Sequence, residues 1–560
     1  MSISKHRIFL YFFFILYFNE ANAQKCAWKE VADQSRYHYN SDVSQALLQP
    51  HQINDADSIY TLPVVIHVIH TGTPVGSADN PTDAQIIAMI TNLNNAFRMN
   101  GASFGGVDIK IQFQLAVRSP FCVSASGINR VDGSVIPYYV SGGITNNGTS
   151  GSADEIAVKN LSKWPNTDYI NIWIVNKING NSTVPGGYTY FPELNNVRTD
   201  GLVLNASVVD GSNKTVVHEM GHYFYLFHTF HDDNGNENSC ATNTDCSNQG
   251  DMICDTEPCL LESNCAVPSN TCTGNPFIIE DAIHGYTVLN NFMGYTDCQW
   301  MFTPGQKTRM RWALFAFRHS LISSGALNLP TSLTPASACI PTAPFGLSNY
   351  YGVQQLDFNT LHVYSNTSNA EAANYIDRTC NQTTTVIKGQ VYPLSVTGSY
   401  LNPHNFKVYI DYNGNGSFSD PGELLLSDYN SISTTNVFIP LTGIKTNTPV
   451  RLRVVADNPA GLQPSSCQLA GDVTGGSGQA EDYSVVILKR QITSIGSGPW
   501  NIPTNWSCNC IPQDDDQVTI KSGYTITVTN AMGTLQCGKL SLESGAICNI
   551  NGTNLKVTGN

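Results

Sequence analysis

Three histidines and one glutamate occur close together in residues 217–230, which read VHEMGHYFYLFHTF. In a helix, His218 and His222 lie one turn apart on the same face, so both imidazoles can bind one metal ion. His228, six residues after His222, supplies a third nitrogen ligand and leaves the fourth position of a tetrahedral zinc ion open. Glu219 projects beside that position and can act as a general base toward water. The spacing therefore predicts a catalytic zinc site.

The alternative interpretation is a buried amphipathic helix whose histidines are incidental. With 13 histidines in 560 residues, the short HExxH pattern is expected by accident in roughly one chain in a hundred. A third histidine at its place lowers this frequency to roughly one in several thousand. The pattern therefore favours the metal site.

An α/β unit with a twisted mixed sheet is predicted to position these side chains. The β-branched stretch 62–70 is typical of a buried strand, and helical spacing predicts a helix over 83–97 that Thr82 caps. Further strands are predicted at 108–117, 169–175 and 201–208, and the helix that carries the first two histidines is predicted to begin near Thr215.

A second segment, 291–295 (NFMGY), follows the histidines and is similar to the Met-turn of metzincins. The region from about Thr61 to Ser320 resembles the pappalysin family of metzincin metalloproteases. The matching strings are LPVVIHVIH, NIWIV, GGYTYFP, HEMGHYFYLFHTF, GDMICDTEP and NFMGYTDCQWMFTPGQ. The resemblance implies a metzincin-type catalytic domain that hydrolyses peptide bonds.

The resemblance also implies roles for single residues. The three histidines would bind zinc, and Glu219 would be general base and acid. Met293 would form the Met-turn under the metal, and Tyr295 would help to hold the oxyanion. Tyr225 departs from the family pattern, which has Gly at this turn, and a left-handed tyrosine costs about 1 kcal/mol relative to glycine.

Residues 215–306 contain no Lys or Arg but twelve Asp and Glu. The resemblance implies that calcium binds here, through Asp251, the carbonyl of Cys254 and Thr256. A solvated acidic loop without an ion is the other interpretation. The acidic surroundings, which include Asp297, lead to the hypothesis that substrates carry Arg or Lys near the cut.

The first residues are typical of an export signal. A positive start and an apolar run precede the small-residue cleavage site ANA at 21–23. We therefore predict a signal peptide over 1–23, a pro-segment over 24–60 and a secreted protein. Cys26 resembles the latency-switch cysteine in pro-segments of this family, and an ordinary disulfide is the other interpretation.

Cysteine content, net charge and hydropathy limit the compartment and the kinds of partner that the protein can have. All 16 cysteines follow the export signal, which in a secreted chain indicates disulfides. Cys298 is expected to pair with a cysteine in 259–272. The net charge of −14 disfavours nucleic acid and anionic membranes as partners, and no later stretch is apolar enough to predict a transmembrane helix.

The chain is predicted to contain further domains after the catalytic one. We place the catalytic domain at 61–322 and a linker rich in Ser, Pro and Thr at 323–344. Residues 345–488 are predicted to form an all-β sandwich and resemble the GEVED domain. Residues 489–560 are predicted to form a small C-terminal β module, with one or two coils of a β-helix.

Two details of these modules bear on function. Asp411, Asn413 and Asn415 alternate before a glycine turn, as the ligands of calcium loops do. A plain Asn-Gly hairpin turn is the alternative. In the last module, Cys508 and Cys510 are expected to form disulfides with Cys537 or Cys548.

The sequence therefore predicts a secreted zinc endopeptidase that acts on proteins or peptides, with calcium as a structural ion. The C-terminal modules are predicted to attach the protein to a cell surface or matrix. The alternative is an adhesin or binding protein that keeps the metalloprotease fold without turnover.

Overall fold

The computed structural model describes residues 58–558 except for gaps at 147, 193–198, 234–238, 247–248, 331–332, 347–350, 365–372, 400–401, 460–462, 474, 514 and 553–554. The predicted export signal, Cys26 and nearly all of the pro-segment lie outside the described residues. The chain forms two compact units. We call Asn95–Lys110 with Phe224–Trp312 the loop unit, and the described parts of Asn54–Asn94, Ile111–Tyr223 and Ala313–Asn560 the sheet unit.

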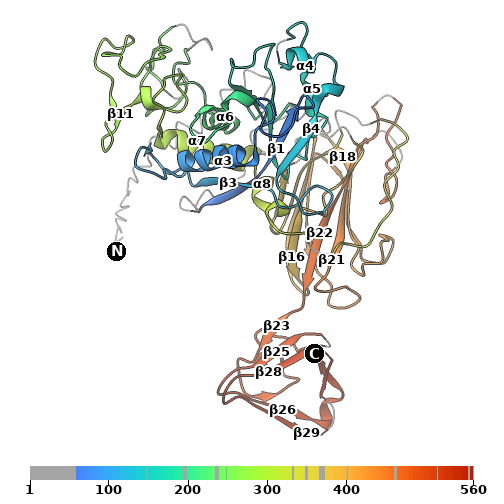
Figure 1. Ribbon diagram of the computed structural model, residues 1–560. Coiled ribbons are helices and arrows are strands. Elements are labelled where there is room, and N and C mark those ends of the chain that lie inside the picture. The colour runs from blue at the N-terminus through green and yellow to red at the C-terminus, as the bar shows by residue number, and fades with distance from the viewer. Residues whose placement is uncertain are drawn as a thin grey trace, which may run out of the picture. The chain divides into compact units, whose positions relative to one another are not determined.

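The sheet unit contains a mixed sheet in the order β3-β1-β7-β9-β8, and β4 also pairs with β1. All of its strand pairs are parallel except that of β8 with β9. Figure 1 shows β4 beside the long strand β1. The strands are β1 (Tyr60–His70), β3 (Ile111–Leu115), β4 (Ile128–Asp132), β7 (Ile170–Val175), β8 (Gly187–Thr189) and β9 (Leu202–Asn205). The predicted α/β unit is confirmed.

Helix α3 (Asp83–Phe97) has the predicted bounds. The Thr82 hydroxyl accepts a hydrogen bond from the Gln85 amide, and the Gln85 side chain accepts one from the Thr82 amide, so a capping box fixes its start. Two predicted strands are shorter in the structure. β3 begins at Ile111 because Lys110 has φ 64°. β9 ends at Asn205, whose side chain accepts the Ser207 amide and starts a 3-10 turn.

Short elements complete this part of the sheet unit. They are β5 (Ile144–Thr145), β6 (Ala153–Asp154), α4 (Tyr139–Gly142), α5 (Glu155–Lys159), α6 (Thr215–Tyr223), α8 (Ser320–Ser323) and the 3-10 turns Gly133–Val135, Ala206–Val208 and Gly325–Leu327. Helix α6 packs against β8 and β9.

The loop unit has little regular structure and is held together by disulfides. These are Cys240–Cys272, Cys246–Cys254 and Cys265–Cys298. The predicted pairing of Cys298 with a cysteine in 259–272 is confirmed. The regular elements are β2 (Gly105–Gly106), β10 (Ile279–Asp281), β11 (Tyr286–Thr287), the 3-10 turn Val288–Asn290, β12 (Met301–Phe302) and most of α7 (Pro304–Phe317).

Residues 353–488 form the predicted β-sandwich. One sheet has the strand order β14-β13-β17-β20. The other has the order β15-β22-β21-β18-β19, and β16 also pairs with β22. Figure 1 shows β16, β22 and β21 side by side. The strands are β13 (Val353–Phe358), β14 (Leu361–Tyr364), β15 (Tyr375–Asp377), β16 (Thr383–Ile387), β17 (Val391–Gly398), β18 (His404–Ile410), β19 (Leu424–Asn430), β20 (Ile432–Phe438), β21 (Pro449–Asp457) and β22 (Gln479–Leu488).

The sandwich contains buried ion pairs on β22. Asp482 accepts hydrogen bonds from the guanidinium of Arg453, and Glu481 accepts them from Arg378. These four side chains are nearly inaccessible to solvent. Removing one partner of such a pair costs about 3–5 kcal/mol, because the remaining charge stays buried.

Contacts also join the sandwich to the mixed sheet within the sheet unit. Cys122 and Cys380 form a disulfide, and the Gln382 side chain donates to the Asp168 carboxylate at 2.5 Å. The second half of the predicted linker is attached to the sandwich, because Cys339 forms a disulfide with Cys467.

Residues 491–557 form a stack of parallel strands, as predicted for coils of a β-helix. The ladders are β23-β25-β28, β24-β26-β29 and β27-β30, and Figure 1 shows the first of them stacked. The strands are β23 (Gln491–Thr493), β24 (Gly498–Pro499), β25 (Gln517–Ile520), β26 (Thr525–Thr529), β27 (Leu535–Cys537), β28 (Lys539–Leu542), β29 (Ile547–Asn551) and β30 (Leu555–Val557), with 3-10 turns Pro503–Asn505 and Asn530–Met532.

The expected disulfides of this module are wrong. Cys508 is bonded to Cys510, whereas Cys537 and Cys548 are free thiols. The turn at Asn509, with φ 48°, places the two neighbouring cysteines within bonding distance.

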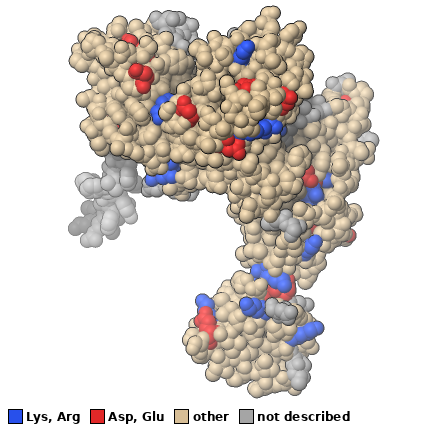
Figure 2. All heavy atoms as spheres, in the orientation of Figure 1, with Lys and Arg blue, Asp and Glu red and all other residues tan. Residues whose placement is uncertain are grey.

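Charged groups are sparse on the face that Figure 2 shows, in keeping with a chain in which 13% of the residues are charged. In the described part of the chain, no helix has the length and apolar character needed to cross a bilayer.

Candidate metal centre

Helix α6 (Thr215–Tyr223) presents the first two histidines. Its first amide, that of Thr215, is bonded to the Asn213 side chain, and Val217 and Met220 are fully buried. The imidazoles of His218 and His222 stand at 88° to each other, with their Nε2 atoms 3.1 Å apart. Two ring nitrogens that face each other in this way are arranged as two ligands of one ion.

The chain makes a turn directly after α6. Tyr225 adopts φ 72°, so the chain keeps a left-handed conformation here although tyrosine stands where the family pattern has glycine. Its ring packs against Phe227 and Trp312. These ring contacts offset part of the cost of placing a side chain in a conformation that favours glycine.

After this turn the third histidine joins the other two. His218, His222 and His228 each offer a ring nitrogen, and the three nitrogens lie within 4.8 Å of one another. Three imidazoles match the donor set of a catalytic zinc ion. The residues present therefore fit zinc.

Glu219 lies between the two histidines of α6 in sequence and is 6% exposed. Burial raises the pKa of Glu219 to about 8. A buried carboxylate of this kind loses a proton readily only when a cation lies nearby. This position therefore suits a group that accepts a proton beside a metal and later returns it.

The Met-turn segment borders His228 within the loop unit. Met293 is fully buried, and its carbonyl accepts the amide hydrogen of Thr229 at 3.3 Å. The hydroxyl of Tyr295 lies 3.1 Å from Nε2 of His228, and its ring packs on Phe230. The Tyr295 hydroxyl is thus next to a ligand nitrogen, and half of the side chain is exposed.

Two residues that support this segment were not predicted from the sequence. The buried side chains of Asn291 and Gln306 form two amide hydrogen bonds of 2.9 and 3.0 Å. Asn291 also accepts the Met293 amide, so the pair holds the turn in place. Both residues lie in the strings that match the family, NFMGY and FTPGQ, which was the available signal.

The predicted calcium residues lie together in the loop unit. The Asp251 carboxylate accepts hydrogen bonds from the Thr256 hydroxyl at 2.8 and 2.9 Å and from the Ile253 amide. Burial raises the pKa of Asp251 to about 7. Arg309 donates to the carbonyls of residues 251 and 252 rather than to this carboxylate.

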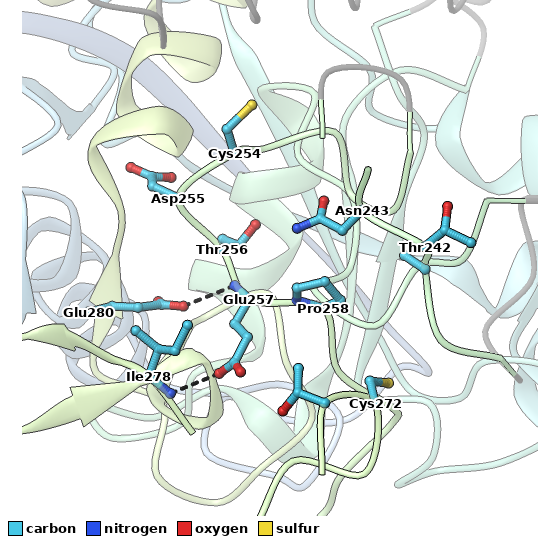
Figure 3. A pocket seen from close by; sticks show the side chains of 12 residues that line it. Thr242, Asn243, Cys254, Asp255, Thr256, Glu257, Pro258, Cys272, Ile278 and Glu280 are labelled. Atoms are coloured by element: carbon cyan, nitrogen blue, oxygen red, sulfur yellow. Dashed lines mark hydrogen bonds between the residues drawn. The ribbon is translucent and has the colours of Figure 1, made fainter. Parts of the chain in front are cut away.

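A cavity of about 440 Å³ adjoins these residues. Figure 3 shows Glu257 and Glu280 on its wall, with the Glu280 carboxylate bonded to the Glu257 amide and the Glu257 carboxylate to the Ile278 amide. The second oxygen of Glu280 is buried and has no hydrogen-bond partner among the described residues. Burial raises the pKa of Glu280 to about 8.

Comparisons with known proteins find similar metalloproteases. Residues 152–315 match the peptidase M43 family, described as Pregnancy-associated plasma protein-A, and residues 405–486 match the GEVED domain. An extracellular metalloprotease of Pyricularia oryzae is 33% identical over 153 residues, which cover 24% of this chain and 47% of that protein. The chain therefore spans about half the length of that relative.

A second relative and a solved structure match longer segments. An extracellular metalloprotease of Arthroderma otae is 26% identical over 294 residues, which cover 50% of this chain and 88% of that protein. The structure of Tannerella forsythia mature mirolysin with a cleaved peptide is 28% identical, covers 49% of this chain and 99% of its own, and has a TM-score of 0.38.

Proposed function

We propose that this chain, which carries a metalloendopeptidase domain of the M43 family at 152–315 and a GEVED domain at 405–486, is a secreted zinc-dependent endopeptidase that cleaves proteins or peptides. The convergence of His218, His222 and His228 carries the proposal. Secretion is supported by the N-terminal sequence and by disulfides such as Cys240–Cys272, which form outside reducing compartments.

The side chains around the histidines would divide the reaction between them. When bound, zinc would polarise the scissile carbonyl and acidify the attacking water. Glu219 would take a proton from this water and return it to the leaving amine. The Tyr295 hydroxyl, next to His228, would donate a hydrogen bond to the carbonyl oxygen as negative charge develops on it.

Replacing Tyr295 with Phe tests the last role. Loss of one oxyanion donor is expected to lower kcat about 10²-fold with little change in KM, because the hydrogen bond strengthens in the transition state. Zinc content should stay that of the parent. An unchanged kcat would remove Tyr295 from the machinery and leave a packing role against Phe230.

The alternative is a binding protein that keeps the fold without turnover. Digestion of casein by the mature protein, with the products mapped by mass spectrometry, separates the two functions. An endopeptidase gives internal cuts that disappear on zinc removal and return with added zinc. A binding protein retains casein without cutting it.

The second part of the proposal concerns specificity. The segment 215–306 lacks basic residues, and the exposed Asp297 follows Tyr295 by two positions. We therefore expect Arg or Lys on one side of the cut. In a peptide library, Asp297→Asn should reduce that preference about two- to fivefold, as for one exposed ion pair. Asp428→Asn, at an exposed site on β19, is the control, and a preference for apolar residues on both sides would refute the idea.

Calcium would bind in the loop unit through Asp251, the carbonyl of Cys254 and Thr256. The buried Asp251 carboxylate supports this proposal, because a cation is needed to keep it ionised at neutral pH. The role of Cys26 as a latency switch and surface attachment through the C-terminal modules stay predictions.

A further inference from the structure

The turn between β18 and β19 contains a buried carboxylate that no positively charged side chain neutralises among the described residues. Glu423 is 2% exposed, and neither of its carboxylate oxygens has a hydrogen-bond partner among the described residues. A buried carboxylate normally has a hydrogen bond or a cation, because losing its hydration costs several kcal/mol. The structure leaves this cost at Glu423 unexplained.

The nearest charged groups increase the cost. Burial and the negative charges of Asp411 and Asp420 raise the pKa of Glu423. Asp411 is itself fully buried, and its two oxygens accept the amides of Asn415 and Gly416. Two carboxylates therefore converge inside one turn, and no ion pair compensates either of them in the described part of the chain.

The rest of the turn offers oxygen atoms at a regular spacing. Asp411, Asn413 and Asn415 occupy its first, third and fifth positions. The sixth position is Gly416, with φ 84°, where calcium loops of the EF-hand type also require glycine. The buried carboxylate of Glu423 stands at the thirteenth position, one residue beyond the glutamate that closes an EF-hand loop.

We propose that Asp411, Asn413, Asn415 and Glu423 form a calcium site in the GEVED domain, separate from the peptidase centre. Carboxylate and amide oxygens are the ligands that Ca²⁺ selects, whereas zinc prefers nitrogen and sulfur. The ion neutralises Glu423 and Asp411 together. This proposal favours the calcium loop over the plain Asn-Gly hairpin turn.

The site also connects to the segment that follows the catalytic domain. A Cβ atom on Gly416 would lie 2.2 Å from the carbonyl oxygen of Ser337, so the turn packs directly on residues 336–337. Arg451 donates a hydrogen bond to the carbonyl of Ala336. Calcium therefore stabilises the surface on which this segment rests.

Calcium binding to the full chain tests the proposal without a readout of peptidase activity. All proteins carry Glu219→Ala to prevent self-digestion, and bound calcium and thermal unfolding are measured with and without added Ca²⁺. Glu423→Gln should bind one ion fewer per chain than its parent and show a smaller calcium-induced rise in Tm, because only the site proposed at Asp251 remains. Without calcium, Glu423→Gln should unfold at a higher temperature than its parent, because the buried charge is gone.

Two further variants complete the test. Asp428→Asn removes an exposed carboxylate from β19 and should keep the parent's stoichiometry and Tm shift. Asn413→Ala, which keeps both buried carboxylates, should weaken calcium binding by about tenfold. If Glu423→Gln and Asn413→Ala both bind calcium as the parent does, the proposed site is wrong.

Discussion

Glu219→Gln is expected to lower kcat for casein or peptide cleavage by about 10²–10⁴-fold, the range that general acid–base groups contribute. The amide has nearly the same shape as the carboxylate but cannot accept the proton of the attacking water. The three histidines are unchanged, so the variant should still bind one zinc ion per chain. Steady-state kinetics with zinc analysis of the same sample measure both quantities.

One control variant and two contrary outcomes make this test decisive. Glu543→Gln, a change of the same kind on the exposed surface of the last module, should leave kcat unchanged. If Glu219→Gln keeps zinc and also keeps the parent's kcat, another residue acts as the base. Loss of zinc together with activity would place the defect at the ligands instead.

His228→Ala is expected to remove both zinc and activity. Zinc binding to structural sites is worth about 10–16 kcal/mol over all ligands, so one ligand accounts for several kcal/mol. The dissociation constant for zinc should therefore rise about 10³-fold, and turnover at micromolar zinc should disappear. Competition with a chromogenic chelator gives the constant.

The matched control for this change is His231→Ala. His231 lies three residues further along the chain and is not part of the triad of ring nitrogens. This variant should keep the zinc affinity of the parent. Stoichiometric zinc in His228→Ala would mean that the third histidine is not a ligand.

Local features of the fold could be predicted from the sequence because their causes are local. The bounds of α3 follow from helical spacing and from the Thr82 cap. The conformation of Tyr225 was left open by the sequence, because tyrosine replaces the glycine of the family pattern, and the structure shows φ 72° there. The spacing of the histidines predicted their convergence, since two of them lie on one helix and the third on the next turn of chain.

Long-range partners could not be predicted in the same way. The pairing of Asn291 with Gln306 depends on how two loops meet, and no sequence period reports that. The pairing of Cys508 with Cys510 depends on the conformation of one residue, Asn509. The sequence did not identify Glu423 as a calcium ligand either. Its carboxylate draws notice only in the structure, where it is buried beside Asp411 and both oxygens lack a hydrogen-bond partner among the described residues.

Anomalous diffraction at the zinc absorption edge, from crystals of the full chain carrying Glu219→Ala, tests the central claim most directly. We predict one strong peak between the rings of His218, His222 and His228. A folded chain without a peak there, or with imidazoles that point away from one another, would contradict the assignment of a zinc peptidase.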